Sequence, residues 1–152
     1  MEPSRAELEM QLAWRLLPIA RRWRRLADRA LAGFGLSVAP GWALVHATRL
    51  GNEVRQSDLA QSLEISGASL VRLIDQLEGA GLIERRADRA DRRANLVRLT
   101  PAGRRLAARI EETLAAIRAR LLEGVSDDRL ADANQVMAAL DSHILAALEE
   151  GA

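Results

Sequence analysis

The stretch from residue 57 to residue 81 constrains the fold most, because it predicts two short helices separated by a tight turn. Ser57-Asp58 opens the first helix, which carries apolar residues on one face, and Ile65 fills the turn. Ser66 is placed to cap the second helix. That helix has apolar residues at helical spacing (Leu70, Leu73, Ile74 and Leu77) and ends at Gly79-Ala80-Gly81. Two short helices joined in this way are typical of a helix-turn-helix.

Two short strands are expected directly after the helix-turn-helix, at residues 82–86 and 96–99. Between them lies a polar loop, residues 87–95, whose only apolar side chains are alanines. A hairpin in this position is a wing. The predicted fold is therefore mainly α, an α+β winged helix-turn-helix reading head with a two-stranded hairpin wing, flanked by N- and C-terminal dimerisation helices.

Long amphipathic helices are expected on both sides of the reading head. In the first, Pro18 should kink the helix or mark a break near residues 14–17. Thr100-Pro101 starts a helix after the wing, and Ser126 caps the last one. The apolar stripes of these helices are too narrow for a separate core, so we expect them to pair with each other and with a second chain.

The expected organisation is a dimerisation helix at 1–36, a winged helix-turn-helix DNA-binding domain at 37–101, and dimerisation helices at 102–152. The residues predicted at the dimer interface are Leu12, Leu16, Ile117, Leu121, Leu140, Ile144 and Leu148.

The composition excludes several classes of protein. The chain has no cysteine, which excludes disulfides, thiolate metal sites, cysteine nucleophiles and thiol redox sensors. Two histidines, without a glycine-rich phosphate loop or a metal-spaced cluster, argue against an enzyme, a metal site or a cofactor. No apolar run approaches the roughly 20 residues of a membrane span, and the first residues do not resemble a signal peptide. We therefore expect a cytoplasmic protein with no membrane partner.

Positive charge is concentrated around the predicted wing. All 22 basic residues of the chain are arginines, which can form bidentate contacts with phosphate or guanine. Residues 85–105 contain eight arginines against two acids, Asp88 and Asp91. Because a local basic patch matters more for nucleic-acid binding than the net charge of +1, this pattern favours DNA as a partner.

The motifs around the wing resemble those of the MarR family of transcription regulators. Asp91-Arg92-Arg93 followed by Leu99-Thr100 is similar to the family's wing signature. Similar helix-turn-helix segments are Ser57-Asp58-Leu59-Ala60, the run from Leu73 to Glu78, and Gly81-Leu82-Ile83; the run Ser69-Leu70-Val71-Arg72 looks closest to the SlyA-like branch. The resemblance implies an obligate two-fold dimer that represses or activates genes, often in response to small aromatic acids and phenols.

The first turn of the second short helix is the predicted base-reading segment, since recognition helices contact bases there. Arg72 can pair with guanine in the major groove. Arg92 and Arg93 would enter the minor groove, with Arg86 and Arg89 on phosphates, and the resemblance implies that Asp91 shapes the wing. The predicted DNA-binding residues are Ser66, Ala68, Ser69, Arg72, Gln76, Arg86, Arg89, Arg92 and Arg93. The alternative is that these are solvated residues of a surface helix and loop.

The resemblance also implies an effector pocket between the first two helices, at Arg21, Trp42 and His46. Arginine would bind a carboxylate, tryptophan would stack on a ring, and histidine would bind a hydroxyl or carboxylate. The alternative is that Trp42 belongs to the core and His46 is a structural histidine.

The predicted function is a homodimeric, sequence-specific DNA-binding regulator of a pseudo-palindromic operator, acting as a repressor that a small aromatic acid or phenol releases. Its partners would be double-stranded DNA, a second copy of the chain and that effector. The alternatives are a SlyA-like activator or anti-silencer, a ligand-independent architectural DNA-binding dimer, or a helical interaction module that has lost DNA binding.

Overall fold

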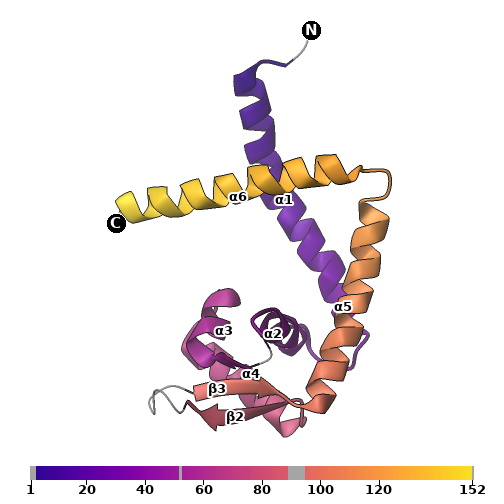
Figure 1. Cartoon of the computed structure of the whole chain (residues 1–152), viewed down its shortest axis with the longest axis vertical. Coiled ribbons are helices and arrows are strands. Elements are labelled where there is room, and N and C mark those ends of the chain that lie inside the picture. Colours follow the sequence, from indigo (N-terminus) through magenta and orange to yellow (C-terminus); the bar gives the residue numbers. More distant parts are fainter. Residues whose placement is uncertain (1–2, 52, 89–94, 152) are drawn as a thin grey trace. The chain divides into compact units, whose positions relative to one another are not determined.

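The computed structural model describes residues 3–51, 53–88 and 95–151 and divides into two units, Met1–Ala115 and Ala116–Ala152 (Figure 1). The first unit holds the helices α1 (Arg5–Ala32), α2 (Val38–Arg49), α3 (Gln56–Ser62) and α4 (Gly67–Gly79), the whole sheet, and most of α5 (Pro101–Leu121). The second unit holds the end of α5 and helix α6 (Asp127–Glu150). This element order confirms the predicted mainly helical winged helix.

The sheet has three antiparallel strands in the order β1-β3-β2, where two were predicted. β2 (Ile83–Ala87) and β3 (Asn95–Leu99) form the predicted hairpin. The additional strand is β1 (Glu53–Arg55), in which Val54 is buried opposite Val97 of β3. A three-residue strand with a single buried side chain has too short an alternating pattern to stand out in a sequence.

The main core lies between the sheet and the helices of the reading head. One face of α4 and the inward residues of the sheet pack with α2, α3 and the start of α5 in one cluster. Its largest fully buried side chains include Leu44, Leu59, Leu70, Ile74, Leu77, Val97 and Leu99. The reading head is therefore a packed scaffold that leaves the opposite face of α4 exposed.

A second cluster packs the C-terminal end of α1 against α2 and α5, and includes Leu31, Trp42 and Ile110. Here α1 and α2 approach closely at Gly41, because an added Cβ would lie 2.3 Å from Leu31 Cδ2. Only glycine permits such proximity without moving the leucine.

Local side chains set the helix ends much as predicted. The Ser66 and Ser126 hydroxyls accept hydrogen bonds from the first turns of α4 and α6. Thr100 caps α5 through the Gly103 N–H. In α1, by contrast, Pro18 lies inside a continuous helix, so no break occurs near residues 14–17. The other hydrogen bonds of a helix of 28 residues keep it continuous past the one that proline removes.

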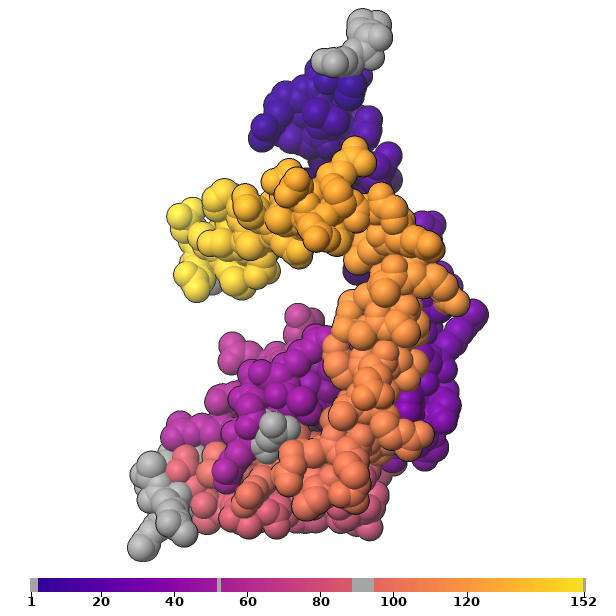
Figure 2. Space-filling model, turned by 45° about the vertical axis from the view of Figure 1, so that its right-hand side comes forward, coloured from indigo at the N-terminus to yellow at the C-terminus, as the bar shows by residue number. Residues whose placement is uncertain are grey.

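Helix α6 forms most of the second unit and has no buried residue. The space-filling view draws the residues of this helix in orange to yellow (Figure 2). Val136, Leu145 and Leu148 are at least half exposed. Such a helix lacks a hydrophobic partner among the described residues of its own unit.

Candidate nucleic-acid interface

The first turn of α4 presents a small polar surface. Ser66 accepts a hydrogen bond from the Ser69 backbone N–H at 3.2 Å, and its hydroxyl donates to the Ser69 hydroxyl at 3.0 Å. Gly67 and Ala68 complete the turn, and all four residues are exposed. Because their side chains are small, a DNA groove can approach the backbone of this turn closely.

Farther along α4, Arg72 is exposed and forms no ion pair or hydrogen bond with the described residues. Gln76 is also exposed, but its amide reaches the Ser37 hydroxyl at the start of α2, 3.5 Å away. Val71 adds an apolar contact surface that sequence reasoning missed, with 44% of its area exposed. The guanidinium of Arg72 is therefore the cation of this face best placed to bind a base or a phosphate.

Arg85 on β2 connects the recognition helix to the wing, a role that sequence reasoning missed. Its guanidinium forms ion pairs with Asp75 and Glu78 of α4, the latter at 3.2 Å, and donates to the Val71 carbonyl at 3.3 Å. The Arg85 backbone N–H also donates to Glu78, at 3.2 Å. The sequence signal would have been two acids three positions apart on α4, followed by an arginine on the next strand. These contacts fix the angle between α4 and the hairpin.

The wing is only partly described. Arg86 is exposed on β2 and pairs with Glu84 at 2.9 Å. The predicted wing-tip residues Arg89, Asp91, Arg92 and Arg93 lie outside the described residues.

The residue that directly follows β2 forms an ion pair with β1. Asp88, whose exposure is 9%, accepts a hydrogen bond from the Arg55 guanidinium at 3.0 Å. The missed strand β1 therefore holds the base of the wing loop through an ion pair as well as through backbone pairing.

The predicted effector residues lie in different surroundings. Trp42 is 6% exposed, and its indole N–H donates to Asp28 at 2.7 Å. Arg24, rather than Arg21, covers the ring, with its guanidinium carbon 4.5 Å from the ring centroid, and also donates to Asp28 at 3.0 Å. Arg21 is exposed on α1. Arg24 lies three positions after Arg21, so only the crossing of α1 over α2 decides which arginine contacts the tryptophan.

His46 lies one helical turn after Trp42, and the two rings meet edge to face at 6.1 Å. Its Nδ1 is 2.7 Å from the Ser62 hydroxyl of α3. Burial, followed by the nearby charges of Arg49 and Arg24, lowers the pKa of His46 below its ordinary value. The imidazole is therefore neutral at neutral pH and bridges α2 and α3.

The predicted dimer residues lie on helices with large exposed apolar areas. In the first unit, Leu12 is exposed and Leu16 half-buried, and the neighbouring Trp14 is 78% exposed. In the second unit, Leu121, Ile144 and Leu148 are exposed, while Ile117 and Leu140 are half-buried.

Among the described residues, no group of three or more His, Cys, Asp or Glu side chains is arranged to hold a metal ion. Among the same residues, no helix combines the length and apolar character that crossing a lipid bilayer requires.

Comparison with known proteins gives consistent matches. Residues 34–94 match the model of the MarR family. Transcriptional regulator PA3341 is 38% identical, over 91% of this chain and 98% of its own, with a TM-score of 0.79. A MarR-family transcriptional regulator from Rhodococcus sp. RHA1 is 29% identical, over 89% and 93% of the two chains, with a TM-score of 0.71. CouR from Rhodococcus jostii RHA1, whose structure contains p-coumaroyl-CoA, is 27% identical, over 86% and 89%, with a TM-score of 0.70.

Proposed function

Because the chain belongs to the MarR family of transcription regulators, we propose that it binds a pseudo-palindromic operator as a homodimer and represses transcription until a small aromatic acid or phenol binds it. Members of this family are regulators and not enzymes, which confirms the expectation that the chain is not an enzyme. One observation carries the proposal. The face of α4 that is turned away from the core combines a capped turn of small residues with Arg72, which has no partner among the described residues.

DNA reading on this proposal divides into base contacts and phosphate contacts. Ser69 and Arg72 of α4 read the major groove, where a bidentate arginine–guanine pair discriminates against other bases by about 1–3 kcal/mol. Ser66, Ala68 and Gln76 contact the DNA beside these two residues. Arg86 and Arg89 bind phosphates. Arg92 and Arg93 enter the minor groove, and Asp91 orients the wing.

Exposed apolar area supports the homodimer. Trp14, Leu17 and Ile19 of α1 each expose more than half of their area, and Leu145 and Leu148 do the same in α6. Apolar patches of this extent mark interaction surfaces in soluble proteins. We propose that these apolar surfaces contact a second copy of the chain. The interface residues would be Leu12, Leu16, Ile117, Leu121, Leu140, Ile144 and Leu148. A two-fold dimer then presents two copies of α4, which is why the operator would be pseudo-palindromic.

The effector proposal rests on the tryptophan, histidine and arginines between α1 and α2. Once Arg24 moves off the buried Trp42, the tryptophan offers a ring to stack on. His46 then supplies a polar edge, and Arg24 with Arg21 a positive charge for a carboxylate. CouR, with its p-coumaroyl-CoA, supports an aromatic acid derivative as the class of ligand. A ligand that prefers the DNA-free spacing of the two α4 helices weakens operator binding by its affinity ratio for the two states.

Within the family, the patterns Ser69-Leu70-Val71-Arg72 and Asp75-Gln76-Leu77-Glu78 support a place near the SlyA-like branch. A regulator of chromosomal DNA works in the bacterial cytoplasm. An in vitro transcription assay with and without the protein distinguishes a repressor from a SlyA-like activator.

The first experiment is a fluorescence-anisotropy titration of the purified protein against duplex DNA from upstream of its own gene, beside a scrambled duplex, near physiological salt. A specificity ratio of about a thousandfold or more supports the proposal. Arg72→Gln should lower the specific affinity by about 1–3 kcal/mol, whereas the exposed Arg129→Gln on α6 should not. Equal, weak binding of both duplexes by the wild type contradicts sequence-specific reading at this promoter.

Two further measurements test the remaining parts. Sedimentation equilibrium should give a dimer for the wild type and a smaller species for Trp14→Glu. Salicylate should lower the operator affinity of the wild type, and Arg24→Gln should reduce that response. If saturating salicylate leaves the affinity unchanged, the proposal fails for that ligand.

A further inference from the structure

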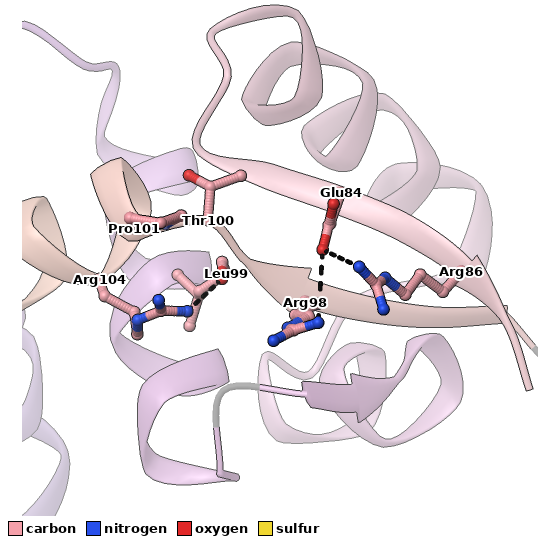
Figure 3. A pocket seen from close by; sticks show the side chains of 7 residues that line it. All are labelled: Glu84, Arg86, Arg98, Leu99, Thr100, Pro101 and Arg104. Atoms are coloured by element: carbon pink, nitrogen blue, oxygen red, sulfur yellow. Dashed lines mark hydrogen bonds and ion pairs between the residues drawn. The ribbon is translucent and has the colours of Figure 1, made fainter.

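A small hollow lies where β2 and β3 meet the start of α5, on the side of the hairpin away from α4 (Figure 3). Its volume is about 240 Å³. Pockets for drug-sized ligands are usually about 300 Å³ or larger, so this one suits a small group. Its lining consists of Glu84, Arg86, Arg98, Leu99, Thr100, Pro101 and Arg104.

The lining of the hollow is strongly positive. Three guanidiniums and one carboxylate line it, which leaves two positive charges uncompensated within it. The carboxylate, Glu84, is shared: its Oε1 lies 2.9 Å from Arg86 Nη2 and 3.8 Å from Arg98 Nη1. Glu53, opposite Arg98 on β1, does not line the hollow.

The third guanidinium, that of Arg104, is held by the backbone instead of by an acid. Its Nη1 donates to the Leu99 carbonyl at 2.8 Å, which orients the group next to the hollow. Arg104 lies in the first turn of α5, where a cation is unfavourable unless an anion is nearby. Among the described residues no acid pairs with it, so its remaining N–H groups can donate to such an anion.

We infer that this hollow is a phosphate-binding site, in which Arg98 and Arg104 hold the phosphate group and Glu84 competes with it. Guanidinium groups bind phosphate oxygens in bidentate geometry. The three guanidinium groups that line this hollow would repel a cation. The phosphate belongs either to the DNA backbone beside the operator, a source that rests on the proposed function, or to a small phosphorylated metabolite.

The carboxylate of Glu84 weakens phosphate binding in the hollow. It pairs with Arg86 and with Arg98, one of the two arginines that hold the phosphate, so the phosphate binds against a built-in competitor. Replacing the carboxylate by an amide keeps its size and removes its charge. Glu84→Gln should therefore bind phosphate up to about fivefold more tightly, the upper limit of the factor that corresponds to one exposed ion pair.

The first arm of the test measures phosphate binding on the full-length protein. The melting temperature is compared in sodium phosphate and in sodium chloride of equal ionic strength, so that each variant serves as its own reference. Phosphate should raise the melting temperature of the wild type and raise that of Glu84→Gln further. The rise should be lost in Arg98→Gln and Arg104→Gln and kept in Arg105→Gln, an exposed neighbour outside the hollow.

The second arm identifies the source through the salt dependence of DNA binding. If the DNA backbone supplies the phosphate, Arg98→Gln and Arg104→Gln should each lower the slope of log affinity against log salt by about one. If a metabolite supplies it, the slopes stay unchanged while phosphate still stabilises the wild type. If neither effect occurs, the inference is wrong. If phosphate stabilises the wild type but the wild type does not bind DNA specifically, the proposed function is contradicted and the phosphate site is supported.

Discussion

Replacing Gly103 by alanine should destabilise the protein, although Gly103 lies in a helix, where alanine is ordinarily favoured by about 1 kcal/mol. An added Cβ would lie 1.9 Å from the Leu82 carbonyl oxygen and 3.2 Å from Leu99 Cδ2. Real Cβ atoms essentially never come closer than 3.0 Å to such atoms. Either α5 or the backbone before β2 must therefore move by more than an ångström.

The size of the effect follows from what that movement disrupts. Overpacking of this kind costs about 1–3 kcal/mol. The Leu82 carbonyl also accepts a hydrogen bond from the Thr100 N–H at 3.0 Å, and losing it costs about 1 kcal/mol more. After the gain in helix propensity, we expect Gly103→Ala to lower the free energy of unfolding by about 1–3 kcal/mol.

The assay is urea unfolding followed by circular dichroism, at one protein concentration, because association changes apparent stability. Gly79→Ala on α4 is the matched control, since an added Cβ there meets no atom within 4 Å. It should be neutral or stabilising by up to about 1 kcal/mol. A Gly103→Ala protein as stable as the wild type would refute the close packing of α5 against Leu82.

Three other predictions concern the reading head. A double-mutant cycle of Arg85→Gln and Glu78→Gln should give a coupling of about 0.5–1 kcal/mol at low salt, smaller near 1 M salt; strictly additive effects would contradict the ion pair. Ser66→Ala should cost about 1 kcal/mol in the same unfolding assay by removing the cap of α4, and no loss would mean that the cap contributes nothing. His46 has a folded-state pKa below its ordinary value, so the unfolded chain takes up its proton first as the pH falls. Stability from the neutral imidazole is then present above about pH 6.5 and lost as the pH falls through the folded-state pKa, and His46→Gln should flatten that part of the stability–pH profile.

The sequence predicted those parts of the fold that depend on neighbouring residues. The cap at Ser66 and the Thr100-Pro101 helix start are formed by hydrogen bonds within one turn, so their signals are local. The hairpin was predictable for the same reason. Strand β1 was not, because Val54 becomes part of a strand only by pairing with Val97, far along the chain.

The candidate site also combines features set by neighbouring residues with contacts between segments distant in sequence. The exposure of Ser69 and Arg72 followed from the apolar spacing of α4. The contacts of Arg85 with α4, and of Arg24 with Trp42, depend on how elements distant in sequence cross, which no periodicity encodes. The roles of the wing-tip arginines stay predictions.

The close approach of α1 to α2 at Gly41 makes the long helix a lever. With no side chain at that point, the fulcrum lies at Leu31, near one end of α1. From there to Arg5 the helix extends roughly 39 Å at about 1.5 Å per residue. A rotation of about 5° at the fulcrum therefore moves the far end by about 3 Å. Trp42 follows Gly41 directly, and its indole bonds to Asp28 of α1, roughly 4.5 Å from the fulcrum on the side of Arg5. A molecule wedged against this indole would therefore turn a displacement of a fraction of an ångström at Asp28 into a movement of several at the far end.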